Sequence, residues 1–376
     1  ATSRIVAGER VVLDGTNGHL IVRPTAAELT QFADRSRRES AAQQELASLS
    51  GAEAVMTDGE RVTLRANVDL PDEAVAAAAS GAEGVGLMRT EFLVVGRAAM
   101  PTEDEQVAAY SKVVKAFGPH PIVIRTYDVG GDKLPIGGFP HEANPFLGWR
   151  AIRMCLDEPE LFKDQLRALL RAGLHGDIRI MLPLIVTVDE VRTTRRLLRE
   201  AASELESRGV AYQHDMPLGV MVETPAAAVA ADTLVGDVAF FSIGTNDLVQ
   251  YTLAVDRGNV NLASRFTPLH PAVLRLIKRT VDVGNENALD VTVCGEMASQ
   301  PLMAFALLGL GVRTLSVNPH SVPLVKYIVR GVSAAFAAEA ANAAVSCRTA
   351  AEAEHQLKFR LAAAFGDAQF LRDGLM

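Results

Sequence analysis

Eight short apolar runs recur along the chain, and most are separated by enough residues for a helix. The runs are rich in Val, Ile and Leu, as expected for parallel strands that are buried on both faces. Eight strand–helix units in series predict a closed parallel (β/α)8 TIM barrel, whose sites lie where the carboxyl ends of the strands meet. The runs are Val62–Asn67, Gly84–Arg89, Ile122–Arg125, Ile178–Pro183, Leu218–Glu223, Ala239–Asp247, Val291–Cys294 and Thr314–Asn318.

Composition narrows the class of protein. The net charge of −8 argues against a nucleic-acid surface, which needs clustered Lys and Arg. No uninterrupted apolar stretch reaches the roughly 18 residues of a membrane span, and Pro301–Val312 predicts a buried helix instead. No signal-peptide pattern is present, and Cys155, Cys294 and Cys347 are too few and too far apart for a disulfide framework. We expect a soluble cytoplasmic protein without membrane insertion.

The two ends of the chain differ from the barrel pattern. Arg10–Asp14 and His19–Arg23 predict a hairpin joined by the turn sequence of residues 15–18, and a hairpin alone is only marginally stable. Thr25 and Glu28 have capping-box spacing before a helix that links the hairpin to the barrel. The Ala-rich segment Val332–Gly366 predicts a C-terminal helical extension.

Arginines follow two successive strands. Arg89 and Arg125 would converge at the barrel mouth, where their planar forks suit phosphate or carboxylate oxygens. Arg257, in the loop of residues 254–258 after the sixth predicted strand, could join them. The alternative is that each arginine pairs with a nearby acid such as Glu91 or Asp128. Two arginines at strand ends of one barrel favour the anion site.

Two acids end adjacent predicted strands. Glu223 and Asp247 offer only hard oxygen ligands, which suit Mg²⁺ when substrate oxygens and waters complete the shell. The alternative is a like-charge pair neutralised by the arginines. Asn246 lies in the turn sequence of residues 244–247, where its amide could donate to a carboxylate or simply form an Asx-turn.

One thiol stands at a predicted strand end. Cys294, followed by glycine, could approach a substrate carbon and donate a proton, or it could be a buried structural cysteine. We interpret Cys155, Cys347 and His270 as structural, and no histidine ends any predicted strand.

A glycine-rich turn and a basic helix start lie near the predicted mouth. In the turn of residues 128–133, the side chains of Asp128, Asp132 and Lys133 could contact the arginines and hold them in position. Of Arg150 and Arg153, one could face the site, although a solvent-exposed face is an equal alternative.

Several motifs together resemble a known family. The sequences GVGLMRTEF from Gly84, IRTYDVGGDK from Ile124 and NPFLGWRAIR from Asn144 come first, followed by VETPA, FSIGTNDLVQYTLAVDRGN and CGEMA in residues 222–298. They are similar to the phosphoenolpyruvate-binding barrel of the Enzyme I family, the phosphoenolpyruvate–protein phosphotransferases of the bacterial sugar phosphotransferase system. The resemblance extends from about residue 4 to 340.

The resemblance implies a role for each candidate residue. It implies that Arg89, Arg125 and Arg257 bind the phosphate of phosphoenolpyruvate and that Asn246, with the backbone at Asp247, binds its carboxylate. It also implies two functions for the remaining groups: Glu223 and Asp247 ligate Mg²⁺, and Cys294 protonates the enolate carbon as pyruvate forms. The phosphoryl group would pass to a histidine on a separate domain and then to the carrier protein HPr, and the barrel would form a homodimer.

The resemblance also sets the expected domains and the rivals. Residues 1–24 would be the tail of a phosphohistidine domain that is otherwise missing, 25–58 a helical linker and 59–376 the barrel with its C-terminal helices. The G-x-x-S-H-type segment of the phosphorylated histidine does not occur, and Asn318 and His320 depart from the family pattern. The rivals are the barrel of a pyruvate phosphate dikinase or phosphoenolpyruvate synthase, and a non-catalytic phosphoenolpyruvate sensor.

Overall fold

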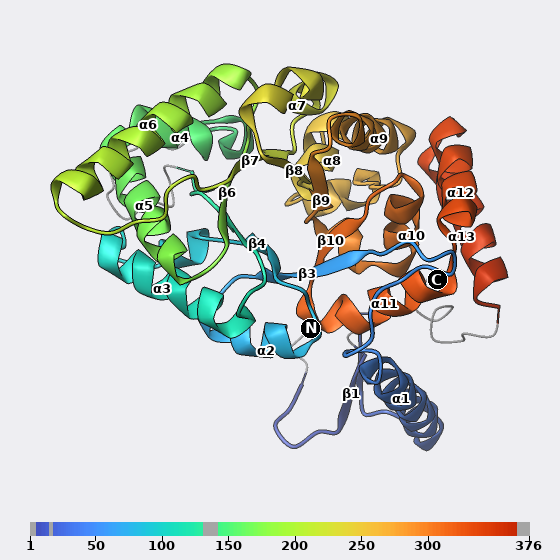
Figure 1. Ribbon diagram of the computed structural model, residues 1–376. Coiled ribbons are helices and arrows are strands. Elements are labelled where there is room, and N and C mark those ends of the chain that lie inside the picture. Colours follow the sequence, from blue (N-terminus) through green and yellow to red (C-terminus); the bar gives the residue numbers. More distant parts are fainter. Residues whose placement is uncertain (1–4, 15–17, 131–141, 367–376) are drawn as a thin grey trace.

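The computed structural model describes residues 5–14, 18–130 and 142–366 of the chain. Eight parallel strands close into a barrel in the order β10-β3-β4-β5-β6-β7-β8-β9, and the helices surround it (Figure 1). The predicted TIM barrel is therefore confirmed. The barrel strands are β3 Thr63–Val68, β4 Val85–Met88, β5 Ile122–Arg125, β6 Ile178–Leu182, β7 Leu218–Val222, β8 Phe240–Ile243, β9 Asp290–Val293 and β10 Thr314–Val317.

One predicted strand was too long. The run 239–247 ends as strand at Ile243, and helix α8 (Thr245–Leu253) begins two residues later, so Asn246 and Asp247 lie in the first helical turn. Gly244 makes this change of direction beside β7, where a Cβ atom would come within 2.7 Å of Oε2 of Glu223. The tight passage between strand and helix was not visible in the apolar pattern.

Successive helices cover the outside of the barrel, so the strands are buried on both faces. The predicted buried helix is α10, and the C-terminal extension is divided into α12 and α13 by a break at residues 347–349. Besides α8, the described helices are α1 Ala26–Ala47, α2 Ala74–Ala79, α3 Glu103–Phe117, α4 Ile152–Asp157, α5 Pro159–Ala172, α6 Val188–Ser207, α7 Pro225–Val229, α9 Pro271–Glu286, α10 Pro301–Gly309, α11 Val322–Gly331, α12 Ala334–Ser346 and α13 Ala350–Ala364.

An ion-pair cluster joins three of the outer helices. The carboxylate of Glu103 on α3 accepts from Arg167 and Arg171 on α5, at 2.8 and 2.5 Å, and from Arg208 at the end of α6, at 3.1 Å. Burial opposes the charge on Glu103, but hydrogen bonds from Arg208, Arg167 and Arg171 outweigh it and lower its pKa to about 2. The cluster therefore fixes α3, α5 and α6 against one another.

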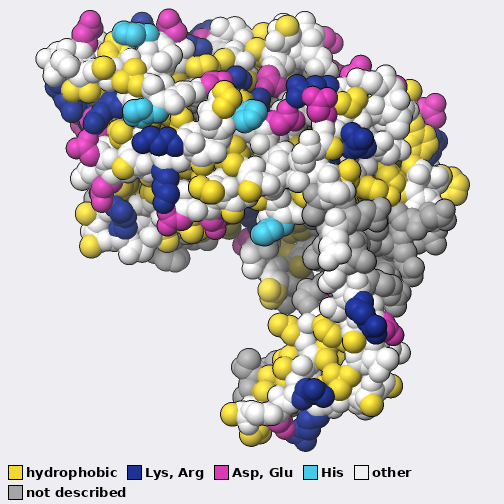
Figure 2. Space-filling view, turned by 60° about the horizontal axis from the view of Figure 1, so that its bottom comes forward, with side chains coloured by type: hydrophobic (Ala, Val, Ile, Leu, Met, Phe, Trp, Pro, Cys, Tyr) yellow, Lys and Arg dark blue, Asp and Glu magenta, His cyan; other side chains and the backbone are white. Residues whose placement is uncertain are grey.

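The N-terminal hairpin and its helix project from the barrel as a separate lobe, and hydrophobic side chains are visible on that lobe (Figure 2). Strands β1 (Val11–Asp14) and β2 (His19–Val22) pair antiparallel, which confirms the predicted hairpin, although residues 15–17 of its turn lie outside the described residues. Thr25 and Glu28 form the predicted capping box at the start of α1.

No single helix in the described part of the chain is long and apolar enough to cross a membrane. The segments 319–331 and 334–346 pass such a test only together, on length and composition, and they meet at an angle of 101°.

Candidate functional site

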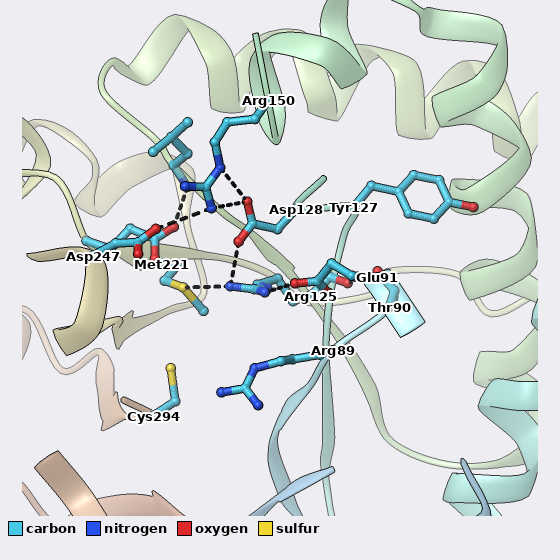
Figure 3. Close-up of polar contacts among 12 residues, drawn as sticks. Arg89, Thr90, Glu91, Arg125, Tyr127, Asp128, Arg150, Met221, Asp247 and Cys294 are labelled. Carbon is cyan, nitrogen blue, oxygen red and sulfur yellow. Dashed lines mark hydrogen bonds and ion pairs between the residues drawn. The ribbon is translucent and has the colours of Figure 1, made fainter. Parts of the chain in front are cut away.

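A cavity of about 660 Å³ opens at the carboxyl ends of the barrel strands. Side chains from five strand ends and their following loops line it, and Arg89, Arg125 and Cys294 point into the same space (Figure 3). The seven predicted site residues all line this cavity: Arg89, Arg125, Glu223, Asn246, Asp247, Arg257 and Cys294.

A period of two along the strands explains why these side chains converge. Alternate strand residues point to the barrel axis, where Leu87, Val123, Met181, Met221, Phe240 and Cys294 form an inner apolar cluster. Arg89, Arg125 and Glu223 each lie two residues after a member of this cluster. The polar side chains therefore stand directly above an apolar floor.

Arg125 is almost fully buried and already paired with acids. Its guanidinium forms an ion pair with Glu91, and its Nη1 lies 2.9 Å from Oδ2 of Asp128. Burial would raise the pKa of Asp128, but Arg125 and Arg150 outweigh this effect and lower it. Arg125 therefore lines the cavity and is also paired with Glu91 and Asp128, the acids named as its possible partners.

Asp247 lies between two arginines from different loops. Its Oδ1 is 2.6 Å from Nη1 of Arg257, and its Oδ2 is 3.3 Å from Nη2 of Arg150. Each guanidinium also lies over the ring of Phe146, at 5.6 Å from its centroid. Arg150 in addition holds Asp128 through Nε at 3.0 Å. The first turn of α8 is therefore tied to the loops on both sides of the mouth.

Arg89 and Asn246 occupy the rim. Arg89 donates to Oδ1 of Asp69 at 2.6 Å and keeps a partly exposed side chain. The side-chain oxygen Oδ1 of Asn246 accepts a hydrogen bond from the backbone N–H of Glu296 at 3.0 Å. The side-chain nitrogen Nδ2 of Asn246 donates to the Glu296 carboxylate at 3.2 Å. The side chain of Asn246, in the first turn of α8, is therefore fixed to Glu296 after β9 instead of forming an isolated Asx-turn.

Glu223 is the acid whose charge is most opposed by its surroundings. Burial, followed by the neighbouring Asp247 and Asp128, raises its pKa to about 8. Its Oε1 accepts from the backbone N–H of Leu184 at 2.7 Å, and Leu184 is held at a φ of +56° to present that group. The neighbouring carboxylates of Asp247 and Asp128 therefore disfavour the charged form of Glu223.

The thiol of Cys294 stands at the edge of the apolar floor. It is 1% exposed, accepts from the hydroxyl of Ser242 at 3.3 Å and donates weakly to the carbonyl of Ile243 at 3.7 Å. Burial raises its pKa to about 11, so the sulfur carries a proton at neutral pH. A protonated thiol beside the cavity can act as an acid towards a bound molecule.

Other predictions have separate outcomes. Arg150 faces the site and Arg153 does not, because Arg153 donates to the backbone carbonyls of Leu147 and Gly148. His270 caps α9 through Nδ1, which confirms a structural role. Asp132 and Lys133 lie outside the described residues. Phe146 and Met221 also line the cavity and were not predicted, because an apolar side chain does not reveal from sequence that it faces a site.

Comparison with known proteins agrees with this geometry. The family described as "PEP-utilising enzyme, PEP-binding domain" matches residues 43–334. Two similar proteins are both named phosphoenolpyruvate-protein phosphotransferase, one from Staphylococcus aureus at 42% identity and one from Geobacillus stearothermophilus at 43%. Each match covers 93% of this chain but only 62% and 61% of the respective relative, so the chain spans about three-fifths of their length. The chain belongs to the PEP-utilising enzyme family, as a member of its PEP-binding domain.

Proposed function

We propose that this chain is the phosphoenolpyruvate-binding part of a phosphoenolpyruvate–protein phosphotransferase. It binds phosphoenolpyruvate with Mg²⁺ and presents the phosphoryl group to a histidine on a separate domain, from which the group passes to HPr. Pyruvate is released. The observation that carries the proposal is that the seven predicted residues, which are three arginines, two acids, an amide and a thiol, all line one cavity of about 660 Å³.

The cavity has the groups that phosphoryl transfer requires. The reaction needs positioning and charge stabilisation more than covalent chemistry from the protein. Arg89, Arg125 and Arg257 bind the phosphate oxygens bidentately, and Asn246 orients the carboxylate of the substrate. Cys294 gives its proton to the enolate carbon, which makes pyruvate a stable product.

Glu223 and Asp247 fit a magnesium ion by their chemistry. Both are buried carboxylates, and the raised pKa of Glu223 reflects burial and the neighbouring negative charges that a divalent cation would compensate. Among the described residues no group of three or more His, Cys, Asp or Glu could hold a metal. Glu223 and Asp247 would therefore hold the ion together with oxygens of the substrate and waters. When bound, Mg²⁺ neutralises charge on the phosphoryl group.

Binding exchanges one set of ion pairs for another. In the structure, Asp247 pairs with Arg150 and Arg257, while Glu91 and Asp128 pair with Arg125. As Asp247 gains a cation, it releases Arg257, which can then turn to the anion. Substrate and metal therefore bind with positive coupling, and each raises the affinity of the other by the same factor.

Two rivals share the cavity. A pyruvate phosphate dikinase or phosphoenolpyruvate synthase would use the same barrel chemistry, and relatives named as protein phosphotransferases at 42–43% identity favour the first assignment. A non-catalytic sensor would not need a thiol in the inner apolar cluster that lines the cavity, and this favours a catalytic role for Cys294.

The proposal extends to the surroundings of the barrel. The exposed apolar side chains of Val6 and Leu13, at 64% and 68%, favour assigning the hairpin lobe to the histidine-bearing domain. The cysteines are all free, which fits a reducing cytoplasmic location. We also propose that the chain forms a homodimer through the barrel. Analytical ultracentrifugation tests this, and a chain that sediments as a monomer at all concentrations would contradict it.

The decisive experiment adds a separately produced histidine-bearing domain to this chain with Mg²⁺ and labelled phosphoenolpyruvate. The proposal predicts label on histidine and release of pyruvate. Folded domains that associate without transferring label would contradict it. Transfer that depends on a nucleotide and phosphate in place of HPr would favour the dikinase or synthase.

A further inference from the structure

The thiol of Cys294 would become a buried anion during the proposed reaction. When its proton leaves, negative charge remains on a sulfur atom that is 1% exposed and packed in the inner cluster with Met221, Phe240 and Leu87. A buried charge without a hydrogen bond is strongly unfavourable. The site therefore needs a donor directed at this sulfur.

Ser242 supplies that donor. It lies on β8, is 1% exposed, and its hydroxyl donates to Sγ of Cys294 at 3.3 Å. It follows Phe240 by two residues and so points to the barrel axis, from the strand next to the one that precedes Cys294. In the described part of the chain, no other side chain is found within hydrogen-bond distance as a donor to this sulfur.

We propose that Ser242 is a positioning residue for the proton transfer. Its hydroxyl fixes the orientation of the Cys294 thiol and stabilises the thiolate left behind. This inference rests on the proposed function, because it takes the enolate of pyruvate as the proton acceptor.

The transfer balances in atoms and charge. The S–H bond of Cys294 breaks, and its proton forms a C–H bond at the methylene carbon with the electron pair of the enolate double bond. The enolate oxygen becomes the ketone oxygen of pyruvate, and its negative charge is replaced by one on sulfur. The Ser242 hydrogen bond then becomes charge-assisted and stronger, and the thiolate later regains a proton from water.

The electrostatics of the site agree with this role. Burial raises the pKa of Cys294, and the hydrogen bond from Ser242 is the largest influence that lowers it. Of the charged groups around the sulfur, Glu223 raises the pKa further, whereas Arg125 and Arg89 lower it. Removing the hydroxyl therefore leaves the thiolate with only more distant positive charges.

The test measures the reactivity of the Cys294 thiol in the full chain without metal. Iodoacetamide alkylation is followed against pH, and the Cys294 peptide is quantified by mass spectrometry, which separates it from Cys155 and Cys347. We expect Ser242→Ala to raise the apparent thiol pKa by about one unit, so that alkylation below this pKa slows about tenfold. Ser242→Thr keeps the hydroxyl and should restore the wild-type profile.

Ser316→Ala is the matched control. Ser316 is another buried serine on a barrel strand, but its hydroxyl donates to Oδ1 of Asn67 at 2.7 Å and not to the sulfur. Its profile should match the wild type. If Ser242→Ala also matches the wild type, or if Ser316→Ala shifts as much as Ser242→Ala, the proposal is wrong.

Two further measurements complete the test. If Ser242→Ala does not fold, Ser242→Cys replaces it, because a cysteine has a similar volume but is only a weak hydrogen-bond donor. A pH dependence of Cys294 alkylation in Ser242→Cys that equals the wild type would overturn the proposal. With the histidine-bearing domain added, Ser242→Ala should lower kcat for pyruvate formation about tenfold with an unchanged KM, and equal kcat would overturn it. The alkylation profile is measured without phosphoenolpyruvate, so it tests the role of Ser242 independently of the proposed function. The proposed function fails separately, if the wild-type chain does not bind phosphoenolpyruvate.

Discussion

Glu223→Gln should remove a pH-dependent weakness of the ligand-free protein. The glutamine keeps the volume of the side chain and an oxygen that accepts from the N–H of Leu184, but it carries no charge beside Asp247 and Asp128. Because the substitution preserves the hydrogen bond, its main effect on stability is electrostatic. We therefore expect the variant to be as stable as the wild type in acid and more stable than the wild type at higher pH.

The magnitude follows from the raised pKa of Glu223. Unfolding lowers that pKa from about 8 to its ordinary value near 4.5, so between these values the folded wild-type protein binds one more proton than the unfolded chain. The free energy of unfolding then decreases with rising pH by at most about 1.4 kcal/mol per pH unit. Between about pH 5.5 and 7.5 the wild type should lose up to roughly 3 kcal/mol relative to Glu223→Gln.

Chemical denaturation with a metal chelator measures this difference. Wild type, Glu223→Gln and the exposed control Glu339→Gln are unfolded at several pH values, and the control should follow the wild type. Adding Mg²⁺ at the higher pH should stabilise the wild type more than Glu223→Gln. Parallel pH dependences of wild type and Glu223→Gln would refute the reasoning, since the carboxyl group would then carry no opposed charge.

Three other substitutions test the site and its support. Cys294→Ala should keep phosphoenolpyruvate binding, measured by calorimetry, but lose most pyruvate formation; unaffected turnover would exclude the proton-donor role. Glu103→Gln should lower the free energy of unfolding by about 1–3 kcal/mol near neutral pH. Because the folded pKa of Glu103 is about 2, this stabilisation is present above about 4.5 and is lost as the pH falls towards 2, so denaturation curves of wild type and variant should converge there. Gly295→Ala would bring a Cβ within 1.9 Å of Oγ1 of Thr245, so it should displace the start of α8 and weaken phosphoenolpyruvate binding; unchanged affinity would contradict this close packing.

The barrel could be predicted because its strands are short apolar runs at regular intervals. Two-sided burial makes such runs continuous, and this pattern is visible without any structure. The end of β8 was not predictable in the same way. Residues 244–247 follow the apolar run directly in sequence, but the chain passes into α8 there, where Gly244 packs closely against Glu223, and that proximity depends on tertiary packing.

The candidate residues were found because strand ends of a barrel converge. What the sequence could not provide is the pairing of charges within the cavity. Arg150 follows a loop and is held at the mouth by Asp128 and Asp247, which are distant from it in sequence. Ser242 was also missed, because a serine inside a strand carries no sign of its partner until the neighbouring strand places Cys294 beside it.

Calorimetric titration of phosphoenolpyruvate into this chain, with and without Mg²⁺, tests the central claim most directly. We predict that Mg²⁺ strengthens phosphoenolpyruvate binding, that phosphoenolpyruvate strengthens Mg²⁺ binding to the same degree, and that both effects are lost in Arg125→Ala. Phosphoenolpyruvate binding of equal strength in wild type and Arg125→Ala, or none in the wild type with Mg²⁺, would contradict the assignment of this cavity.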